Sequence, residues 1–530
     1  MRRDLAILAL LAALLFLPGL GRRDLWNPDE ARYAEVAREM LLLGHWAVPH
    51  LNGQVYTQKP PLFFWAIALS GWITGGLNET TARLPTALSA IAAVLLVFRI
   101  GERFFGRRAA WIAAAAFATS FKILWQGRFG QIDMTLTALV LLGVWFWVRA
   151  YTEDRPRLYL LFFAAAGFAT LAKGPVGLLP PLLSMLAFLG FTRNRREIGR
   201  MNIGLGLLLW AAVVLAWLVP AGLDGGREYL DQIVFKQNVT RYADPWHHFQ
   251  PWYYYLTLIP GEFFPWSFLL PTALVLGWKH ITEKPARDGF LFCLCWAAVT
   301  ILFFSVSPAK RSVYILTMYP AMALMVGAAL DRVAAEWPRW RRWLVIPLGL
   351  VAGLILLIFV AVPVVGDRRP EVAFLGGDRF VWELTGAFVP MLLGALFAGW
   401  VSRHGSVPRA VASLAGGIAV TVVAVSLFLL HDFDVFKSAR SLSQTLVSRM
   451  APGDVYGIYP RLDATFLFYT RRFAVVLESE EELRAFLARP GRVWLLAQRD
   501  DFVKVGHLPA LREVARDSDP RAGYILFTKP

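Results

Sequence analysis

The chain has 530 residues, of which 57% are hydrophobic, and a mean hydropathy of +0.50. A soluble protein of this length is normally much less apolar, so the composition excludes an ordinary globular domain. The formal net charge of +16 is compatible with nucleic-acid binding, but the Lys and Arg residues lie mainly in short segments between apolar runs. Such segments orient membrane helices and contact phospholipids, so we expect membrane phospholipids as partners and no nucleic acid.

The first apolar run, Leu5 to Leu20, resembles a signal peptide, but no small-x-small cleavage pattern precedes Trp26. We expect a retained first span with a cytoplasmic N-terminus. The apolar stretch from Pro61 to Leu77 is short and opens with two prolines. If it crossed the membrane, the arginines after the next span would lie outside, against the positive-inside rule. We therefore expect it to lie along the outer interface, within one external segment of residues 21–83.

Apolar runs of membrane-spanning length recur along the chain as far as residue 430. With the first run they predict about 13 transmembrane helices, the others near residues 84–104, 109–126, 132–150, 157–173, 176–191, 203–221, 263–278, 289–305, 312–330, 343–364, 381–401 and 409–430. The loops that this order assigns to the cytoplasm carry arginine clusters, as at residues 193–200 and 339–342. An odd number of spans places the C-terminus outside.

The segment 431–530 has a different character. Short strands are predicted at 454–459, 473–477, 493–497 and 524–528, and amphipathic helices at 438–450 and 480–488. The sequence therefore predicts a polytopic α-helical membrane protein with a transmembrane domain of residues 1–430. A soluble α/β domain of residues 431–530 follows it on the outer face.

A helix start is predicted just after the first apolar run. Asn27 is a good N-cap, and Glu30 stands three residues later, as in a capping box. On this helix Asp29, Arg32 and Tyr33 share one face. Two interpretations are open, because the acids could simply complement the helix dipole, or the carboxylate, guanidinium and phenol could belong to a functional site.

Other unusual polar residues fall in predicted outer loops or at the outer ends of spans: Tyr56, Lys59, Asp133, Lys173, Arg241, His247, His248, Lys310, Arg311 and Tyr314. A single Lys or Tyr at a span end has the simpler explanation of snorkelling or interface anchoring. Carboxylates such as Asp29 and Asp133 gain nothing from the interface and need a partner. Acids and cations that face one aqueous mouth suit catalysis on an anionic lipid, in which cations hold a phosphate and a carboxylate handles a proton.

Four motifs occur in chain order: Asp29-Glu30-x-Arg32-Tyr33-Ala34, Tyr56-x-x-Lys59-Pro60-Pro61-Leu62, Ala172-Lys173-Gly174-Pro175 and Lys310-x-x-x-Tyr314-Ile315-Leu316. Together they resemble the ArnT-like branch of the bacterial GT-C membrane glycosyltransferases, which is related to the protein O-mannosyltransferases. The resemblance runs through most of the chain. It implies thirteen spans, juxtamembrane helices in the first external loop and a terminal periplasmic α/β domain.

The same resemblance implies an enzyme of the bacterial inner membrane. Its members invert the anomeric centre as they transfer a sugar from a polyprenyl phosphate, undecaprenyl phosphate in bacteria, to a periplasmic acceptor. In the best-known members of the branch the sugar is 4-amino-4-deoxy-L-arabinose and the acceptor is a lipid A phosphate. Another envelope lipid or glycan fits the motifs equally well.

The expected reaction is a single displacement at the anomeric carbon. Lys59 and Arg241 are expected to bind the departing polyprenyl phosphate, with Lys173 and Tyr314 as helpers. The candidate catalytic carboxylates are Asp29, as base or acceptor-orienting group, and Asp133. The expected substrate-binding residues are Arg32, Tyr33, Tyr56, Gln58 and Lys310.

Gln58 departs from the pattern of the branch, which usually has Glu directly before Lys-Pro-Pro. A carboxylate there would suit an amino sugar or a metal ion, whereas Gln58 can hydrogen-bond a neutral sugar hydroxyl. His247 and His248 have no adjacent acid, so we interpret them as loop residues that form hydrogen bonds and not as metal ligands. The reaction requires no cofactor, and a divalent metal stays open as an addition to it.

Three alternatives stay open at this stage. Transfer to protein hydroxyls fits the same motifs. A transporter or flippase for a lipid-linked sugar would place ionisable residues near the bilayer midplane, with broken helices in matched halves. A non-enzymatic scaffold for envelope assembly would act through residues 431–530.

Overall fold

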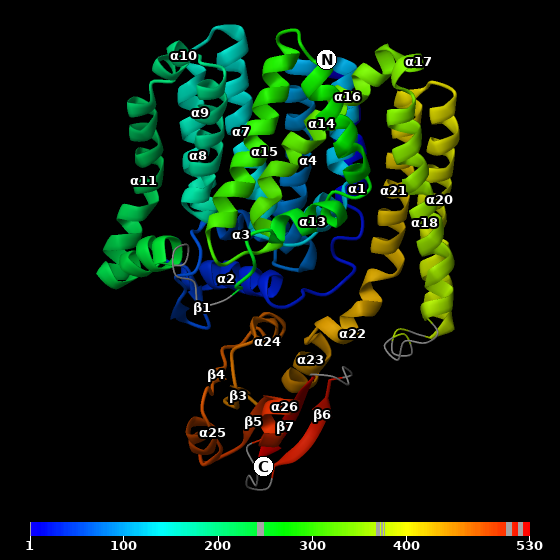
Figure 1. The fold of residues 1–530 in the computed structure, drawn as a ribbon. Coiled ribbons are helices and arrows are strands. Elements are labelled where there is room, and N and C mark those ends of the chain that lie inside the picture. The colour runs from blue at the N-terminus through cyan, green and yellow to red at the C-terminus, as the bar shows by residue number, and fades with distance from the viewer. Residues whose placement is uncertain are drawn as a thin grey trace.

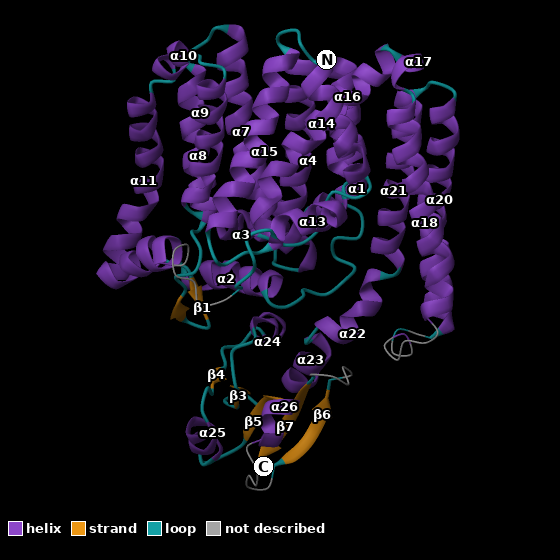
Figure 2. Ribbon diagram, viewed as in Figure 1, coloured by secondary structure: helices purple, strands orange, loops and turns teal. Residues whose placement is uncertain are grey.

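The structure is a computed structural model that describes the chain except residues 1, 241–247, 367–371, 373–374, 376, 505–510, 518–522 and 530. A bundle of long helices forms most of the molecule, and a small mixed domain follows it (Figures 1 and 2). The N-terminus lies at one end of the bundle and the small domain lies beyond the other end, which we call the loop end (Figure 1). This arrangement confirms the predicted fold class.

The bundle follows the predicted order of apolar runs. Its helices are α1 (Arg2–Phe16), α4 (Glu79–Phe105), α5 (Arg107–Ala118), α7 (Ile132–Glu153), α8 (Leu158–Lys173), α9 (Leu179–Phe191), α11 (Ile203–Leu230), α14 (Leu270–His280), α15 (Ala286–Val306), α16 (Tyr319–Ala335), α18 (Arg342–Gly366), α20 (Asp378–Arg403) and α21 (Val407–Phe428). Among the described residues, eight helices are long and apolar enough to cross a membrane, or nine if one bent pair counts as a span. The chain is thus a multi-pass membrane protein, and the predicted count of thirteen is not confirmed.

Two predicted spans are interrupted. The run 109–126 divides at Thr119 into α5 and α6 (Phe121–Gln126). The Thr119 hydroxyl bonds to Ala115 O at 2.6 Å and receives the Trp266 indole N–H at 3.0 Å. The run 263–278 begins with a 3-10 turn, η3 (Trp266–Leu269), after Pro265, whose ring cannot continue a helix. The preceding α13 (Tyr254–Glu262), which the sequence did not predict, meets the η3–α14 segment at 107°.

The predicted basic loops lie together at the N-terminal end of the bundle. They contain α10 (Arg195–Arg200) and α17 (Trp337–Trp340), both close to that end in Figure 1. At the loop end, α11 continues into a π-helix, η2 (Asp231–Thr240), and two 3-10 turns, η1 (Pro175–Gly177) and η4 (Ser312–Met318), precede α9 and α16. The basic loops and the predicted site are therefore at opposite ends of the helices.

The first loop (residues 17–78) contains α2 (Asp29–Leu43), the short hairpin β1 (His50–Leu51) and β2 (Gln54–Val55), and α3 (Leu62–Thr74). The predicted N-cap is wrong, since α2 begins after Pro28 without any side-chain cap bond. The Asn27 amide instead donates to Asp463 Oδ2 at 2.7 Å. The predicted capping box is absent as well, because the Glu30 carboxylate is turned toward two arginines.

The Glu30 carboxylate is 2% exposed and accepts six hydrogen bonds. Arg23 donates at 2.6 and 2.9 Å, Arg83 of α4 at 2.8 and 2.9 Å, and the backbone N–H groups of Gly130 and Trp26 at 2.7 and 3.2 Å. Burial alone would raise the pKa of Glu30, but the charges of Arg23 and Arg83 hold it below its ordinary value. We call Glu30, Arg23 and Arg83 the Glu30 network; it fixes the start of α2 against the bundle.

The C-terminal domain has a five-stranded sheet of order β4-β3-β5-β7-β6, built from β3 (Val455–Tyr459), β4 (Val475–Val476), β5 (Val493–Gln498), β6 (Arg512–Arg516) and β7 (Tyr524–Lys529). Strands β4, β3 and β5 are parallel, and β7 pairs antiparallel with β5 and β6. Its helices are α22 (Asp434–Lys437), preceded by η5 (Leu430–Phe433), α23 (Arg440–Arg449), α24 (Ala464–Thr470), α25 (Glu480–Leu487) and α26 (Arg499–Lys504). The four predicted strands and two predicted helices are present, whereas β6, α22, α24 and α26 were not predicted. The boundary at residue 430 stays a prediction.

The C-terminal domain is bound directly to the first loop. Asp434 accepts the Trp26 indole N–H at 2.7 Å, the Tyr469 hydroxyl accepts Leu25 N–H at 2.8 Å, and Phe468 of α24 is buried in the apolar cluster of α2 and α3. These contacts hold the segment just before Asp29 from the side opposite the bundle.

We predict that Glu30→Gln destabilises the protein by about 3–5 kcal/mol, because two buried arginines lose their carboxylate partner. Thermal unfolding of the purified protein in detergent measures the loss. The matched control is Glu480→Gln on α25, where the carboxylate pairs with Arg484 on the surface and the expected change is below about 1 kcal/mol. An equally small effect at Glu30 would contradict the importance of the Glu30 network.

Candidate active site

The Asp29 side chain lies at the loop end, where α2, α7 and η4 meet. Its carboxylate accepts hydrogen bonds from the Arg311 guanidinium at 3.3 Å and from the Gln131 amide at 3.2 Å. Burial alone would lower the pKa of Arg311, but Asp29 and Asp133 raise it above its ordinary value, so the guanidinium is charged. Asp29 is thus a 9% exposed carboxylate held by residues from two other parts of the chain.

The predicted substrate-binding residues of the first loop are gathered beside Asp29. Tyr33 packs against Phe63 and Phe64 with ring centroids 5.8 and 5.6 Å away, and its burial and the Asp29 charge raise its pKa. Arg32 donates to Gln58 Oε1 at 3.3 Å. The Tyr56 hydroxyl reaches the same oxygen at 3.5 Å, the limit of hydrogen-bonding distance.

A second acid–base pair stands at the ends of α7 and α8. Asp133 forms an ion pair with the Lys173 ammonium, and both side chains are largely buried. The ammonium also lies 4.9 Å from the ring centroid of Tyr314, within cation–π distance. The sequence predicted these three residues for one site, and the structure brings them together.

The remaining predicted residues differ in position. Lys59 is half-buried in the loop before α3, directly after Gln58. Lys310 is buried, and its ammonium donates to the backbone oxygens of Ser307 and Gln250 at 2.6 and 3.0 Å. These bonds hold the loop before η4, so its neighbour Arg311, and not Lys310, reaches Asp29.

Arg241 and His247 lie outside the described residues. Asn238 stands three positions before Arg241 and lies close to the backbone of Gly174, the residue after Lys173. Gly174 has a φ of +89°, and a Cβ on it would lie 2.3 Å from Asn238 Oδ1. Only glycine fits this close approach at a positive φ, which explains the Lys-Gly-Pro order at the end of α8.

Sequence reasoning missed two residues of the site. Arg311 was among the polar residues at the outer ends of spans but was given no role, and Gln131 was not singled out. Among the described residues, the Gln131 Oε1 atom is buried and lacks a hydrogen-bond partner, while its Nε2 bonds to Asp29. An acceptor without a donor beside the candidate carboxylate is available to a substrate hydroxyl or ammonium.

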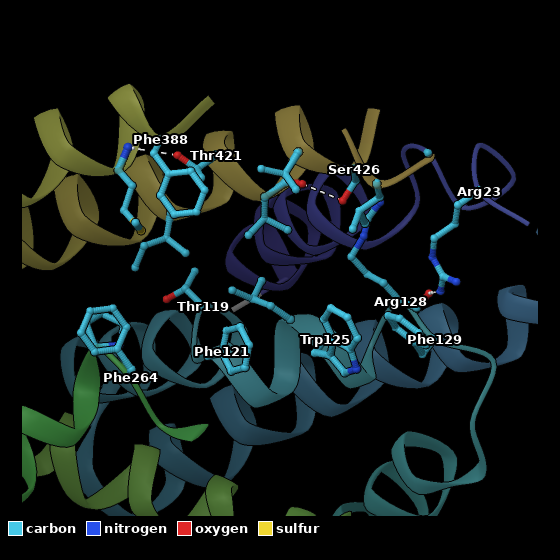
Figure 3. A pocket seen from close by; sticks show the side chains of 18 of the residues that line it. Arg23, Thr119, Phe121, Trp125, Arg128, Phe129, Phe264, Phe388, Thr421 and Ser426 are labelled. Atoms are coloured by element: carbon cyan, nitrogen blue, oxygen red, sulfur yellow. Dashed lines mark hydrogen bonds between the residues drawn. The ribbon is translucent and has the colours of Figure 1, made fainter. Parts of the chain in front are cut away.

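A cavity of about 510 Å³ lies beside Asp29 and Gln131. It is lined by Trp26, Asn27, Pro28, Asp29, Glu30, Trp125, Phe129, Gln131, Leu430, Phe433 and Lys437. It adjoins a mainly apolar cavity of about 300 Å³, and the two share Trp125, Phe129 and Leu430. Figure 3 shows this apolar cavity, with Phe121, Trp125 and Phe264 along one side, Phe388, Thr421 and Ser426 along the other, and Arg23 and Arg128 at one end. An apolar chamber of this kind suits the hydrocarbon chain of a lipid.

The residues present do not form an evident metal site. No group of three or more His, Cys, Asp or Glu side chains that could hold a metal ion occurs in the ranges that the structure describes. Asp29 and Asp133 are each paired with a cation, and Gln58 supplies a neutral oxygen that Arg32 already uses. We therefore derive no step through a metal.

Comparison with known proteins agrees with this geometry. Residues 58–219 match the family described as dolichyl-phosphate-mannose-protein mannosyltransferase. The chain is 32% identical over 361 residues to the undecaprenyl phosphate-alpha-4-amino-4-deoxy-L-arabinose arabinosyl transferase of Pectobacterium atrosepticum, covering 66% of this chain and 63% of that protein. It is 27% identical over 481 residues to the protein of the same name from Erwinia tasmaniensis, covering 85% and 84%.

The fold is similar to that of ArnT from Cupriavidus metallidurans bound to undecaprenyl phosphate, with a TM-score of 0.84 at 24% identity over 99% of this chain and 97% of that one. The chain is thus similar in sequence to these transferases and has the fold of ArnT. The family resemblance drawn from the four motifs is therefore confirmed. The roles of the individual residues of this ArnT-like protein are not tested by the comparisons and stay predictions.

We predict that Asp133→Asn destabilises this ArnT-like protein by about 3–5 kcal/mol, because the ammonium of Lys173 then stays buried without its partner. Lys173→Met should have a similar effect. The double variant should recover most of the loss, since neither charge remains, and the recovery measures the coupling of the pair. Melting temperatures of the four proteins test this; additive losses would show that the two side chains do not interact.

Proposed function

We propose that the protein is an inverting glycosyltransferase that moves a sugar from a polyprenyl phosphate to a lipid acceptor at the outer face of the bacterial inner membrane. The relatives named above carry undecaprenyl phosphate and 4-amino-4-deoxy-L-arabinose in their names, and the proposal adopts this donor class. For the acceptor we propose a lipid A phosphate or a similar envelope glycolipid.

The position of Asp29 is the observation that supports the proposal most directly. Its carboxylate faces a cavity beside an apolar chamber and is held by Arg311 and Gln131 at the end of the bundle. A lipid can rest its chains in the apolar chamber while its head group reaches Asp29. A transporter is disfavoured, because these charges lie at helix ends and not near the middle of the bundle.

The donor phosphate needs cations as it departs with the bonding electron pair. We assign this role to Lys59 and Arg241, and propose that Lys173 and Tyr314 assist. The Asp133–Lys173 pair has little net charge, so Asp133 is better suited to positioning the Lys173 ammonium than to acting on the sugar.

Asp29 orients the acceptor at the anomeric carbon. An acceptor oxygen forms the new bond on one face while the bond to the phosphate oxygen breaks on the other, which inverts the configuration. An acceptor that is already a phosphate brings its own negative charge and needs no base, so Asp29 then stabilises positive charge on the sugar. Arg311, next to Asp29, is placed to hold such an anionic acceptor.

The sugar is recognised by Arg32, Tyr33, Tyr56 and Gln58 in this proposal. Gln58 and Tyr56 offer neutral polar groups that can form hydrogen bonds with sugar hydroxyls.

The predicted orientation has a direct test in spheroplasts. With Cys293 and Cys295 replaced by alanine, single cysteines at His50 and Glu480 should react with a membrane-impermeant maleimide. Single cysteines at Arg195 and Arg339 should react only after permeabilisation, because the basic loops are retained in the cytoplasm. Labelling of residue 195 in intact spheroplasts, or protection of residue 480, would reverse the topology and place the site on the wrong side for the proposed substrates.

We predict that Asp29→Asn lowers turnover by about a hundredfold or more while the protein still extracts and melts normally. The change keeps the shape of the side chain and removes its charge. Turnover is measured as polyprenyl phosphate released from the sugar donor in the presence of lipid A.

The matched control for Asp29→Asn is Glu79→Gln at the start of α4. This carboxylate lies at the same end of the bundle, bonds to Arg440 and Tyr469 at 3.1 Å, and lines neither the Asp29 cavity nor the apolar one. Equal and mild losses at both positions would remove Asp29 from the chemistry.

A further inference from the structure

A third cavity, of about 530 Å³, lies between the first loop and the C-terminal domain. The first loop contributes Asn27, Pro28 and Arg32, and the C-terminal domain contributes residues that include Lys437, Arg461 and Asp463. Unlike the apolar chamber, it is mainly lined by polar groups. A polar cavity between two parts of the chain, beside a candidate active site, is a suitable position for a ligand.

This interdomain cavity adjoins the cavity beside Asp29. Asn27, Pro28 and Lys437 line both cavities. A molecule whose reacting group is at Asp29 therefore has the interdomain cavity beside it, toward the C-terminal domain. The apolar chamber adjoins the Asp29 site through other residues, Trp125 and Phe129. The cavities thus lead from an apolar chamber, past Asp29, to a polar space, which suits an amphipathic acceptor.

The walls of the interdomain cavity are held by one buried acid. Asp463 is 7% exposed and accepts hydrogen bonds from the Asn27 amide at 2.7 Å and from Thr465 N–H at 2.9 Å. Its lone pairs are therefore engaged in joining the two parts of the chain, and burial raises its pKa. Asp463 therefore supports the wall of the cavity and offers little negative charge to a ligand.

The cationic side chains of the cavity are more available to a ligand than the Asp463 carboxylate. Lys437 and Arg461 are exposed, and in the described part of the chain neither forms a salt bridge. Arg461 donates a hydrogen bond to a neutral group, Gln498 Oε1, at 3.3 Å. Arg32 adds a third cation from the opposite wall, whereas Asp517 is the other acid in the lining. Cations from both walls that face one polar space are suited to an anion such as a phosphate.

We propose that the interdomain cavity binds a second phosphate of the acceptor glycolipid, so that the C-terminal domain selects acceptors with two phosphates. This inference rests on the proposed function, since it names a further part of the same acceptor. One phosphate reacts beside Asp29, and the other is held by Lys437 and Arg461.

The test compares bisphosphorylated with monophosphorylated lipid A as acceptors for the full-length protein in a neutral detergent. The wild-type protein should prefer the bisphosphorylated lipid, measured as the ratio of the two kcat/KM values. Lys437→Glu and Arg461→Glu, alone and together, should reduce this preference about tenfold, mainly through KM, because a charge-assisted contact to the second phosphate is lost. The milder Lys437→Gln and Arg461→Gln serve if a reversal variant fails to fold.

The control is the pair Arg489→Glu and Arg512→Glu, two exposed arginines of the same domain that do not line the cavity. It changes the net charge by the same amount and should keep the acceptor preference. An unchanged preference in the cavity variants would overturn the inference while the proposed function stands; absence of transfer by the wild-type protein to either lipid would overturn both. If the effect of the cavity variants appears only when phosphatidylglycerol is added, the cations bind the membrane surface and the inference is wrong.

Discussion

The buried Glu30 network is the constraint on which the site depends. A carboxylate at 2% exposure with two arginines is costly to desolvate, and it is stable only because six hydrogen bonds satisfy it. Arg83 also binds three backbone oxygens of the first loop, those of Leu20, Arg23 and Asp24, at 2.6–2.8 Å. The network therefore determines where α2 begins, and Asp29 is the first residue of that helix.

The segment from Asp24 to Asn27 is held from two sides. The Glu30 network anchors it to the helix bundle, while Asp434, Asp463 and Tyr469 of the C-terminal domain bind it from outside. Asn52 adds a reciprocal pair of bonds to the backbone of Ala474, each 2.9 Å long, and Glu39 of α2 in turn accepts Asn52 N–H at 2.6 Å. The C-terminal domain is consequently part of the support for Asp29, and disruption of that domain should loosen the site.

Much of this arrangement could be predicted from sequence because it depends on local patterns. Long apolar runs and basic loops predict a helix bundle and its two ends, and four short motifs bring Asp29, Lys173 and Tyr314 to one end. Contacts between distant residues could not be predicted in this way. Glu30 satisfied a local capping pattern, yet its partners Arg83 and Gly130 are 53 and 100 positions away. For the same reason Lys310, and not Arg311, was predicted as a substrate-binding residue. The two cations are adjacent in sequence, and only the conformation of the loop before η4 shows which of them reaches Asp29.

The most direct test of the account is the stereochemistry of the reaction. The purified protein is incubated with an undecaprenyl phosphate-linked sugar and bisphosphorylated lipid A, and the anomeric configuration of the product is read by NMR while undecaprenyl phosphate is quantified. We expect one undecaprenyl phosphate released for each sugar transferred, with the anomeric configuration inverted, because one displacement takes place between Asp29 and the donor phosphate. A product with retained configuration would contradict a single displacement, and an unconsumed donor would contradict the proposed function itself.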